Sequence, residues 1–257
     1  MKRREFLTSG IAGAAGMSSF AAAMQRSDGG KREYYELRQY RLLNRDKRGP
    51  VGEFLREVGI PAMNRVGIKP VGVFNAIYGP SDPTLYVLMV HNSLESVVTA
   101  SERLLADSEF RKSDFCNAAY DEPAYVRIES SLMVAFKDMP KLELPEKKSR
   151  IFELRIYESH SVKAAKKKIE MFNEGGEIAI FRKTGLKPVF FGETLIGPQM
   201  PNLTYMLVFD NMEMRDRKWG TFGRDPDWKK LRANPAYKDT VCNITDTILG
   251  PTGYSQI

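Results

Sequence analysis

The sequence predicts an α+β fold, in which two ferredoxin-like repeats of β-α-β-β-α-β order close into one intramolecular dimeric α/β barrel. Three observations support this prediction. The motif Glu-Leu-Arg-x-Tyr begins at Glu36 and again at Glu153. Further short matches follow at nearly constant spacing, and each half of the chain repeats the same order of strand-like and helix-like patterns. A tandem duplication accounts for all three observations, so the two repeats are expected to share one fold.

The internal matches keep their order along the chain. The two copies of the first motif lie 117 positions apart, and the later matches lie 118 or 119 positions apart. Such regularity over five landmarks indicates duplication rather than coincidence. The matched pairs are Glu36 with Glu153, Gly67 with Gly185, Gly79 with Gly197, Tyr86 with Tyr205, and Phe110 with Trp228.

The elements of the first repeat follow from the spacing of its apolar side chains. Residues 34–42 alternate between apolar and polar, which predicts a strand with one buried face. The apolar side chains of 51–58 recur with a helical period, and Gly67 marks the end of that helix. A hairpin, a second helix and a last strand complete the order, and they are expected at 71–78, 85–90, 93–105 and 127–136.

The second repeat shows the same order of elements. They are expected at 152–157, 163–172, 189–196, 203–209, 212–219 and 243–249. A charged, proline-containing stretch joins the two copies and is interpreted as a linker. The chain therefore divides into a signal peptide and start segment, a first repeat, a linker and a second repeat, at 1–30, 31–140, 141–149 and 150–257.

The duplication also predicts how the two sheets meet. A four-stranded sheet with both helices on one face leaves the other face bare, and that face must be buried. Two such sheets can cover each other and curl into one barrel. Because one chain supplies both sheets, we expect a pseudo-symmetric barrel within a single polypeptide.

These motifs resemble the NIPSNAP family. The resemblance rests on Glu-Leu-Arg-x-Tyr at a strand start, on Gly-x-Lys-Pro before the second strand, and on Asp225-Pro226-Asp227-Trp228 near a helix of the second copy. It covers both copies and implies a dimeric α/β barrel. The molecular activity of the family is poorly defined, so no catalytic residue is carried over. Asp107-Ser108-Glu109-Phe110 lacks the Pro and Trp of its counterpart, which indicates that the copies have diverged.

The first residues resemble a twin-arginine export signal. Lys2-Arg3-Arg4-Glu5-Phe6-Leu7 supplies paired arginines and Phe-Leu, and the Ala- and Gly-rich stretch from Ile11 to Ala23 ends in three alanines that suit a signal peptidase. A membrane anchor is the alternative, but the stretch lacks a bulky apolar run. We expect an exported, periplasmic protein without stable membrane insertion after signal removal. Eukaryotic NIPSNAP members are instead associated with mitochondria.

The two first strands carry the candidate ligand-binding residues. Side chains alternate along a strand, so a Glu, an Arg and a Tyr share one face and apolar residues share the other. We expect the apolar face to pack on the helices and the polar face to point into the barrel. Either Glu–Arg ion pairs across the sheets fix their register, or an arginine binds a carboxylate of a small ligand. The candidates are Glu36, Arg38, Tyr40, Glu153, Arg155 and Tyr157.

Other residues with useful chemistry give weaker signals. His91 and His160 form no local cluster, so no metal site is predicted, and nothing specific indicates haem. Cys116 and Cys242 are expected as buried thiols, with a disulfide as the alternative. Three aromatic side chains near the second helix of the second copy are expected in the core, or else at a pocket rim: Trp219, Phe222 and Trp228.

Composition limits the function classes. The 257 residues are 42% hydrophobic and 28% charged, with a formal net charge of +7, which is an ordinary globular balance. The basic residues are scattered, and no recognition helix, zinc-finger spacing or RNA-binding signature indicates nucleic-acid binding. No phosphate loop, nucleophile elbow or Cys–His pair indicates a particular reaction.

Three functions remain open. The favoured one is binding of a small apolar or acidic molecule between the two repeats, without turnover. The alternatives are a monooxygenase-like enzyme of the dimeric α/β-barrel class, with an unknown cofactor, and a structural or interaction protein without ligand. The reaction, the ligand and the oligomeric state, including a homo-oligomer, stay undetermined. A barrel interior filled with side chains would favour the structural alternative.

Overall fold

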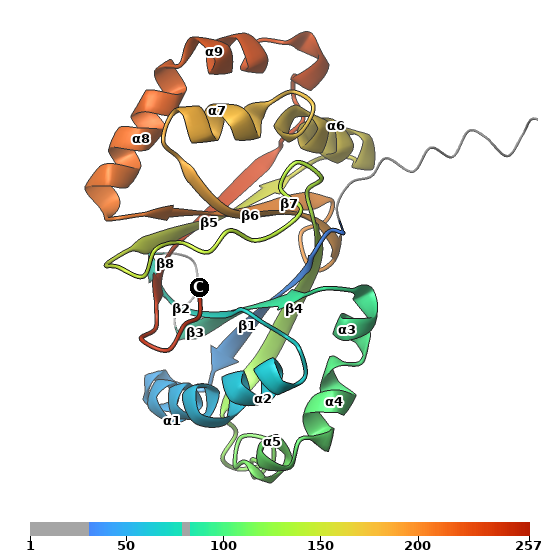
Figure 1. Cartoon of the computed structure of the whole chain (residues 1–257), viewed down its shortest axis with the longest axis vertical. Helices are drawn as coiled ribbons and strands as arrows, with labels where there is room; N and C mark the ends of the chain where they lie inside the picture. The colour runs from blue at the N-terminus through green and yellow to red at the C-terminus, as the bar shows by residue number, and fades with distance from the viewer. Residues whose placement is uncertain (1–30, 79–82) are drawn as a thin grey trace, which may run out of the picture.

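The computed structural model describes residues 31–78 and 83–257, and its strands close into one barrel (Figure 1). The predicted export signal lies outside these residues. Around the barrel the strands follow the order β1-β3-β2-β8-β5-β7-β6-β4. Their bounds are β1 Tyr34–Leu42, β2 Val71–Tyr78, β3 Thr84–His91, β4 Tyr125–Ala135, β5 Ile151–Glu158, β6 Lys187–Ile196, β7 Asn202–Phe209 and β8 Asn243–Pro251.

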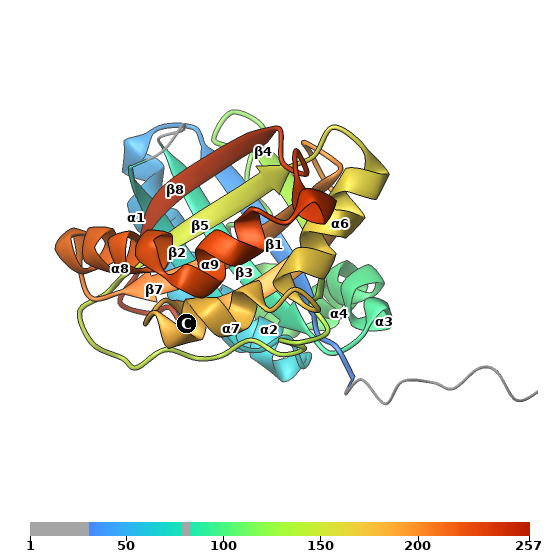
Figure 2. The same cartoon turned by 90° about the horizontal axis from the view of Figure 1, so that it is seen from above.

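Helices cover the barrel on two opposite sides, one set for each repeat (Figures 1 and 2). The first set comprises α1 Arg48–Phe54, a π-helical turn Leu55–Gly59, α2 Ile60–Arg65, α3 Leu94–Val98, α4 Ala100–Ala106 and α5 Ser108–Lys112. The second set comprises α6 Val162–Phe172, α7 Glu177–Lys183, α8 Met212–Arg224 and α9 Pro226–Arg232. Within the described residues, no helix combines the length and apolarity needed to cross a bilayer.

The strand order confirms two ferredoxin-like repeats. The first repeat pairs its strands as β4-β1-β3-β2, and the second pairs them as β8-β5-β7-β6. The barrel closes at two seams, where the second strand of each repeat pairs with the last strand of the other, β2 with β8 and β6 with β4. Both repeats therefore use the same two strands in the shared interface, as the two subunits of an isologous dimer do.

Side chains from both sheets fill the barrel interior. Tyr35, Phe74, Phe152, Phe190 and Leu249 belong to one buried apolar cluster to which all eight described strands contribute. Two glycines show how close the packing is. A methyl group on Gly72 would lie 2.6 Å from the Phe74 ring, and one on Gly192 would lie 2.9 Å from Cβ of Met133. Residues 252–257 run back along β2, and the Ile257 side chain joins the same cluster.

The predicted orientation of the first strands is wrong. The apolar residues Tyr35, Leu37, Phe152 and Leu154 point into the barrel. The polar face points outward, and Tyr40 and Tyr157 pack in the clusters beneath the helices. The physical reason is solvation. The space between the sheets takes apolar groups from every strand, whereas outside the barrel Ser130 donates a hydrogen bond to Glu36, and Arg215 and Trp219 donate to Glu153.

The pairing of Tyr86 with Tyr205 in the repeat alignment is also wrong, by one residue. Arg38 lies opposite Val87, and its counterpart Arg155 lies opposite Tyr205. Val87 is therefore the counterpart of Tyr205. Because neighbouring residues of a strand face opposite ways, Tyr86 lies inside the barrel, and Tyr205 lies under the helices.

Candidate functional site

The first-repeat candidates form a compact ion-pair network between sheet and helices. The Glu36 carboxylate accepts hydrogen bonds from Arg38 Nε at 2.6 Å and from Ser130 Oγ at 2.7 Å. Nε2 of the buried His91 lies 3.7 Å away. Burial alone would raise the pKa of Glu36, but His91, Arg38 and Ser130 together lower it from 4.5 to about 2. The network therefore stabilises an ionised carboxylate under α3.

The second-repeat candidates form a similar network with different partners. The fully buried Glu153 carboxylate accepts hydrogen bonds from Arg155 Nη1 at 2.6 Å, from Arg215 Nη2 at 2.6 Å and from Trp219 Nε1 at 2.7 Å. The last two belong to α8, so this carboxylate ties β5 to its covering helix. The expected Glu–Arg pairs form in both repeats, but within a strand rather than across the sheets. Ligand binding by the six candidates stays a prediction.

The remaining candidate residues divide between core and surface. The aromatic trio near α8 packs in the second repeat's core cluster, as predicted. His91 is fully buried, and its Nδ1 lies 3.0 Å from Ser96 Oγ. Both cysteines are free, and the expectation of two buried thiols is wrong because Cys242 is exposed and Cys116 is half-buried. Among the described residues, no group of three His, Cys, Asp or Glu is arranged to hold a metal ion.

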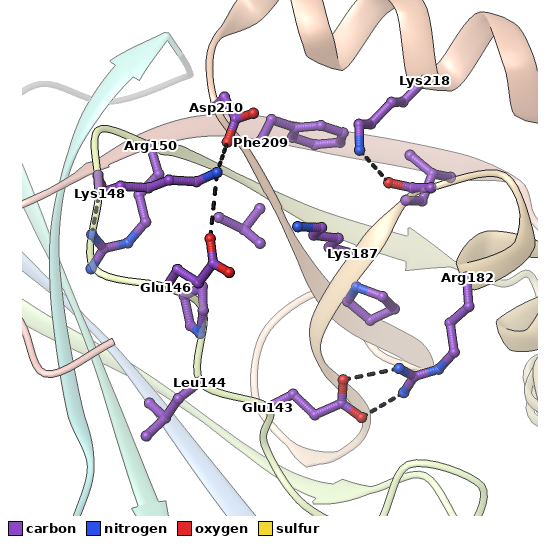
Figure 3. A pocket seen from close by; sticks show the side chains of 15 residues that line it. Glu143, Leu144, Glu146, Lys148, Arg150, Arg182, Lys187, Phe209, Asp210 and Lys218 are labelled. Atoms are coloured by element: carbon purple, nitrogen blue, oxygen red, sulfur yellow. Dashed lines mark hydrogen bonds and ion pairs between the residues drawn. The ribbon is translucent and has the colours of Figure 1, made fainter.

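A pocket of about 390 Å³ opens between the linker and the second repeat (Figure 3). We name it the linker pocket. One wall is formed by the linker and Arg150, which follows it, and the opposite wall runs from the end of α7 into β6, at 182–188. The end of β7 and Lys218 of α8 complete the lining. The linker lies beside β6 because Glu143 donates its backbone N–H to Val189 O.

Positive charge exceeds negative charge around the linker pocket. Five cationic side chains face three carboxylates. Arg182 pairs with Glu143 through two hydrogen bonds, of 2.6 and 2.9 Å. Lys148 lies 2.9 Å from Asp210 and 3.5 Å from Glu146. These pairs use all three carboxylates at ion-pair distance. Lys187 and Lys218 interact with Asp210 only at longer range, and Arg150 has no Asp or Glu partner in the pocket.

Arg150 is the most distinctive of these cations. Its Nη1 and Nη2 donate to the backbone oxygens of Lys148 and Ile257, at 2.9 and 3.1 Å, while its buried Nε has no hydrogen-bond partner. No Asp or Glu side chain within the described residues lies at ion-pair distance from it, and its Nη2 contacts an oxygen of Ile257, the last residue of the sequence. Burial lowers the pKa of its guanidinium. An anion entering the pocket would find a partly desolvated charge without an Asp or Glu partner.

Apolar side chains line the rest of the linker pocket. Leu186 and Phe209 are buried at its base, beside Pro188 and Val208. The exposed Leu144 stands on the linker side. Lys187 lies at the start of β6 and, within the described residues, has no carboxylate at ion-pair distance. An apolar base under unpaired cations suits a small amphiphilic anion.

A smaller pocket lies outside the barrel, where residues of the two repeats meet. That pocket measures about 230 Å³ and lies between the end of β4 and α6. Its charges compensate one another, since Lys137 pairs with Glu174 and Lys166 with Glu193. Sequence reasoning missed the linker pocket because its cations lie far apart along the chain. The repeated Gly-x-Lys-Pro motif, which contains Lys187, was the one available signal.

Comparison with known proteins places the fold. The sequence profile of the NIPSNAP family matches residues 35–140 and 152–256. Curated protein sequences gave no match. Two solved structures, named provisionally as monooxygenases from Fusobacterium nucleatum and Lactobacillus acidophilus, are similar at 13% and 12% identity, each with a TM-score of 0.55. Both alignments cover 86% of this chain, and they cover 92% and 94% of the other chains. A NIPSNAP-like domain protein from Burkholderia xenovorans is 24% identical over 42% of this chain and 90% of its own, with a TM-score of 0.38.

Proposed function

The chain belongs to the NIPSNAP family and forms its barrel from two tandem copies, and we propose that it binds a small amphiphilic anion in the linker pocket, without turnover. The ligand combines a carboxylate or phosphate group with a small apolar body. The observation that carries this proposal is Arg150, a partly buried guanidinium that has no Asp or Glu partner within the described residues and lies above an apolar base. The densely packed barrel interior speaks against a site inside the barrel and favours a structural role for the interior itself.

The charge distribution supports an anion over a neutral molecule. A charge-assisted hydrogen bond contributes about 1.5–3 kcal/mol, roughly twice the net contribution of a neutral one. Arg150 and Lys187 lie on different walls, and a ligand anion between them would contact both the linker and β6. Binding would therefore also hold the linker against the second repeat.

Octanoate is a suitable probe, with octanol as its neutral counterpart. We expect calorimetry to show tighter binding of octanoate than of octanol, and the Arg150→Gln variant to weaken octanoate binding by about 10- to 100-fold. Arg232→Gln on the exposed side of α9 is the matched control and should leave the affinity unchanged. Equal affinities for the two probes, or an undiminished affinity in Arg150→Gln, would contradict the proposal.

A monooxygenase-like reaction is the alternative function. Its support is the name of the two similar structures, and at 12–13% identity that likeness extends to the fold alone. Binding at Arg38 or Arg155 is a further alternative within the binding function, although each guanidinium already bonds to a neighbouring glutamate.

We also propose that the protein is exported through a twin-arginine route. The support is the sequence of Lys2-Arg3-Arg4-Glu5-Phe6-Leu7 and the Ala-rich stretch after it. The double change Arg3→Lys/Arg4→Lys should retain the full-length protein in the cytoplasm of a bacterial host, as measured by cell fractionation. Export that continues in this variant would refute the proposed route.

A further inference from the structure

The two repeats carry different net charges. Residues 31–140 contain 15 Lys or Arg and 15 Asp or Glu side chains, so the first repeat is neutral overall. Residues 150–257 contain 17 basic and 13 acidic side chains, which gives the second repeat a net charge of +4. Both repeats build the same fold, so the fold itself does not require this difference.

The difference is concentrated in the segment that follows the third strand of each repeat. Residues 94–122 and 212–240 are equivalent at the 118-position offset, and α3 and α8 begin at their first residues. The first of these segments has three basic and seven acidic side chains, whereas the second has eight basic and five acidic ones. The two equivalent segments therefore have opposite net charges, −4 and +3.

These two segments lie on opposite sides of the barrel. In Figure 1, α8 and α9 lie above the barrel, whereas α3, α4 and α5 lie in the lower half of the view. We name the part of the surface formed by 212–240 the positive end and the part formed by 94–122 the negative end. The fused chain thus has a charge asymmetry that a symmetric homodimer could not have.

Cations at the positive end are exposed and have no ion-pair partner. Trp228 and Leu231 turn one side of α9 towards the core, and Lys229 and Lys230 are exposed on the other side. Neither these lysines nor Arg224, at the end of α8, has a carboxylate at ion-pair distance among the described residues. The acidic side chains of 212–240 all have a cationic partner already: Glu213, Asp216, Asp225, Asp227 and Asp239.

An anionic membrane surface suits this arrangement. A layer of anionic headgroups presents its negative charge in a plane, so it can contact several exposed cations without a groove or a complementary shape. The negative end is repelled by the same surface, which favours a single orientation. A second copy of the chain is a less suitable partner, because head-to-tail contacts would repeat without closing and the net positive charge of the chain opposes association.

We propose that the positive end docks the protein on anionic phospholipid headgroups, with the first repeat facing away from the membrane. Arg224, Lys229 and Lys230 contact the headgroups, and the association is peripheral. Salt weakens it, because exposed charges are screened over about 8 Å at physiological ionic strength. None of the three residues lines the linker pocket, so this surface is separate from the proposed anion site and does not depend on it.

Sedimentation of the whole protein with lipid vesicles tests the proposal. Vesicles of phosphatidylcholine mixed with phosphatidylglycerol should bind the protein about tenfold or more tightly than vesicles of pure phosphatidylcholine. The double variant Lys229→Gln/Lys230→Gln should weaken binding to the mixed vesicles by about tenfold or more. Arg111→Gln/Lys112→Gln changes the equivalent positions of the first repeat and is the matched control, which should bind like the wild type.

The control separates the positive end from the total charge. Both double variants remove two positive charges from exposed side chains, and circular dichroism checks that both fold. Equal weakening by the two variants, or unchanged binding of Lys229→Gln/Lys230→Gln, overturns the proposal. Wild-type binding that does not depend on phosphatidylglycerol overturns it as well. Self-association without lipid that is lost in Lys229→Gln/Lys230→Gln would assign the positive end to a second copy of the chain instead.

Discussion

At the scale of single residues, the duplication preserved a carboxylate and replaced its surroundings. Glu36 and Glu153 occupy equivalent positions and each accepts a hydrogen bond from the arginine two residues later. Glu36 also accepts a hydrogen bond from Ser130 and lies near His91. Glu153 instead accepts hydrogen bonds from Arg215 and Trp219 of α8. Because an unpaired buried charge is costly, each repeat had to evolve its own full set of partners.

The Glu36 network predicts a pH dependence of stability. The pKa of Glu36 is about 2 in the folded protein against 4.5 for a free side chain, so the ionised form stabilises the fold. This contribution is fully present above pH 4.5 and is lost as the pH falls towards 2, an effect of roughly 3 kcal/mol. Between pH 5 and pH 2, urea unfolding should show a smaller loss of stability for Glu36→Gln than for the wild type. An equal loss of unfolding free energy in the variant and the wild type would exclude Glu36 as a source of acid sensitivity.

At the scale of the elements, sequence patterns predicted the strands and helices but not which way they face. Alternation along β1 shows that Tyr35 and Glu36 lie on opposite faces of the sheet. It does not show which face points into the barrel and which faces the helices. The outcome depended on partners from distant segments, Ser130 on β4 and Trp219 on α8, which no local pattern reveals. The linker pocket was unpredictable for the same reason, since Arg150 and Lys187 meet only after the linker has packed beside β6.

The packing of β6 against β4 gives a prediction about the barrel interior. A methyl group on Gly192 would lie 2.9 Å from Cβ of Met133, an atom that cannot move without the backbone. Gly192→Ala should therefore destabilise the protein by about 1–3 kcal/mol in urea unfolding. Gly49→Ala is the control, because nothing lies within 4 Å of its new methyl group and alanine favours the α1 helix. An unchanged urea midpoint for Gly192→Ala would show that the barrel interior can accommodate the added methyl group.

At the scale of the whole molecule, fusing two repeats into one chain freed their outer surfaces to diverge. The paired strands at the two seams, β2 with β8 and β6 with β4, must remain complementary to each other, because their pairing closes the barrel. The helical layers and the linker carry no such constraint. Two differences between the halves lie there. The buried Lys168 occupies a position where the first repeat, at the 117-position offset, has Val51, and the second repeat carries the linker pocket.

This division explains why a filled barrel does not by itself make the protein purely structural. A homodimer would present every outer pocket twice, with the same charge each time. In the fused chain, the linker pocket on the second repeat is mainly cationic, whereas a surface cleft on the first repeat, lined by residues of 47–58 and 112–124, is mainly anionic. The interior of the barrel holds the two halves together, and the chemistry that distinguishes them lies on its outside. A small anion should therefore select the second repeat over the first.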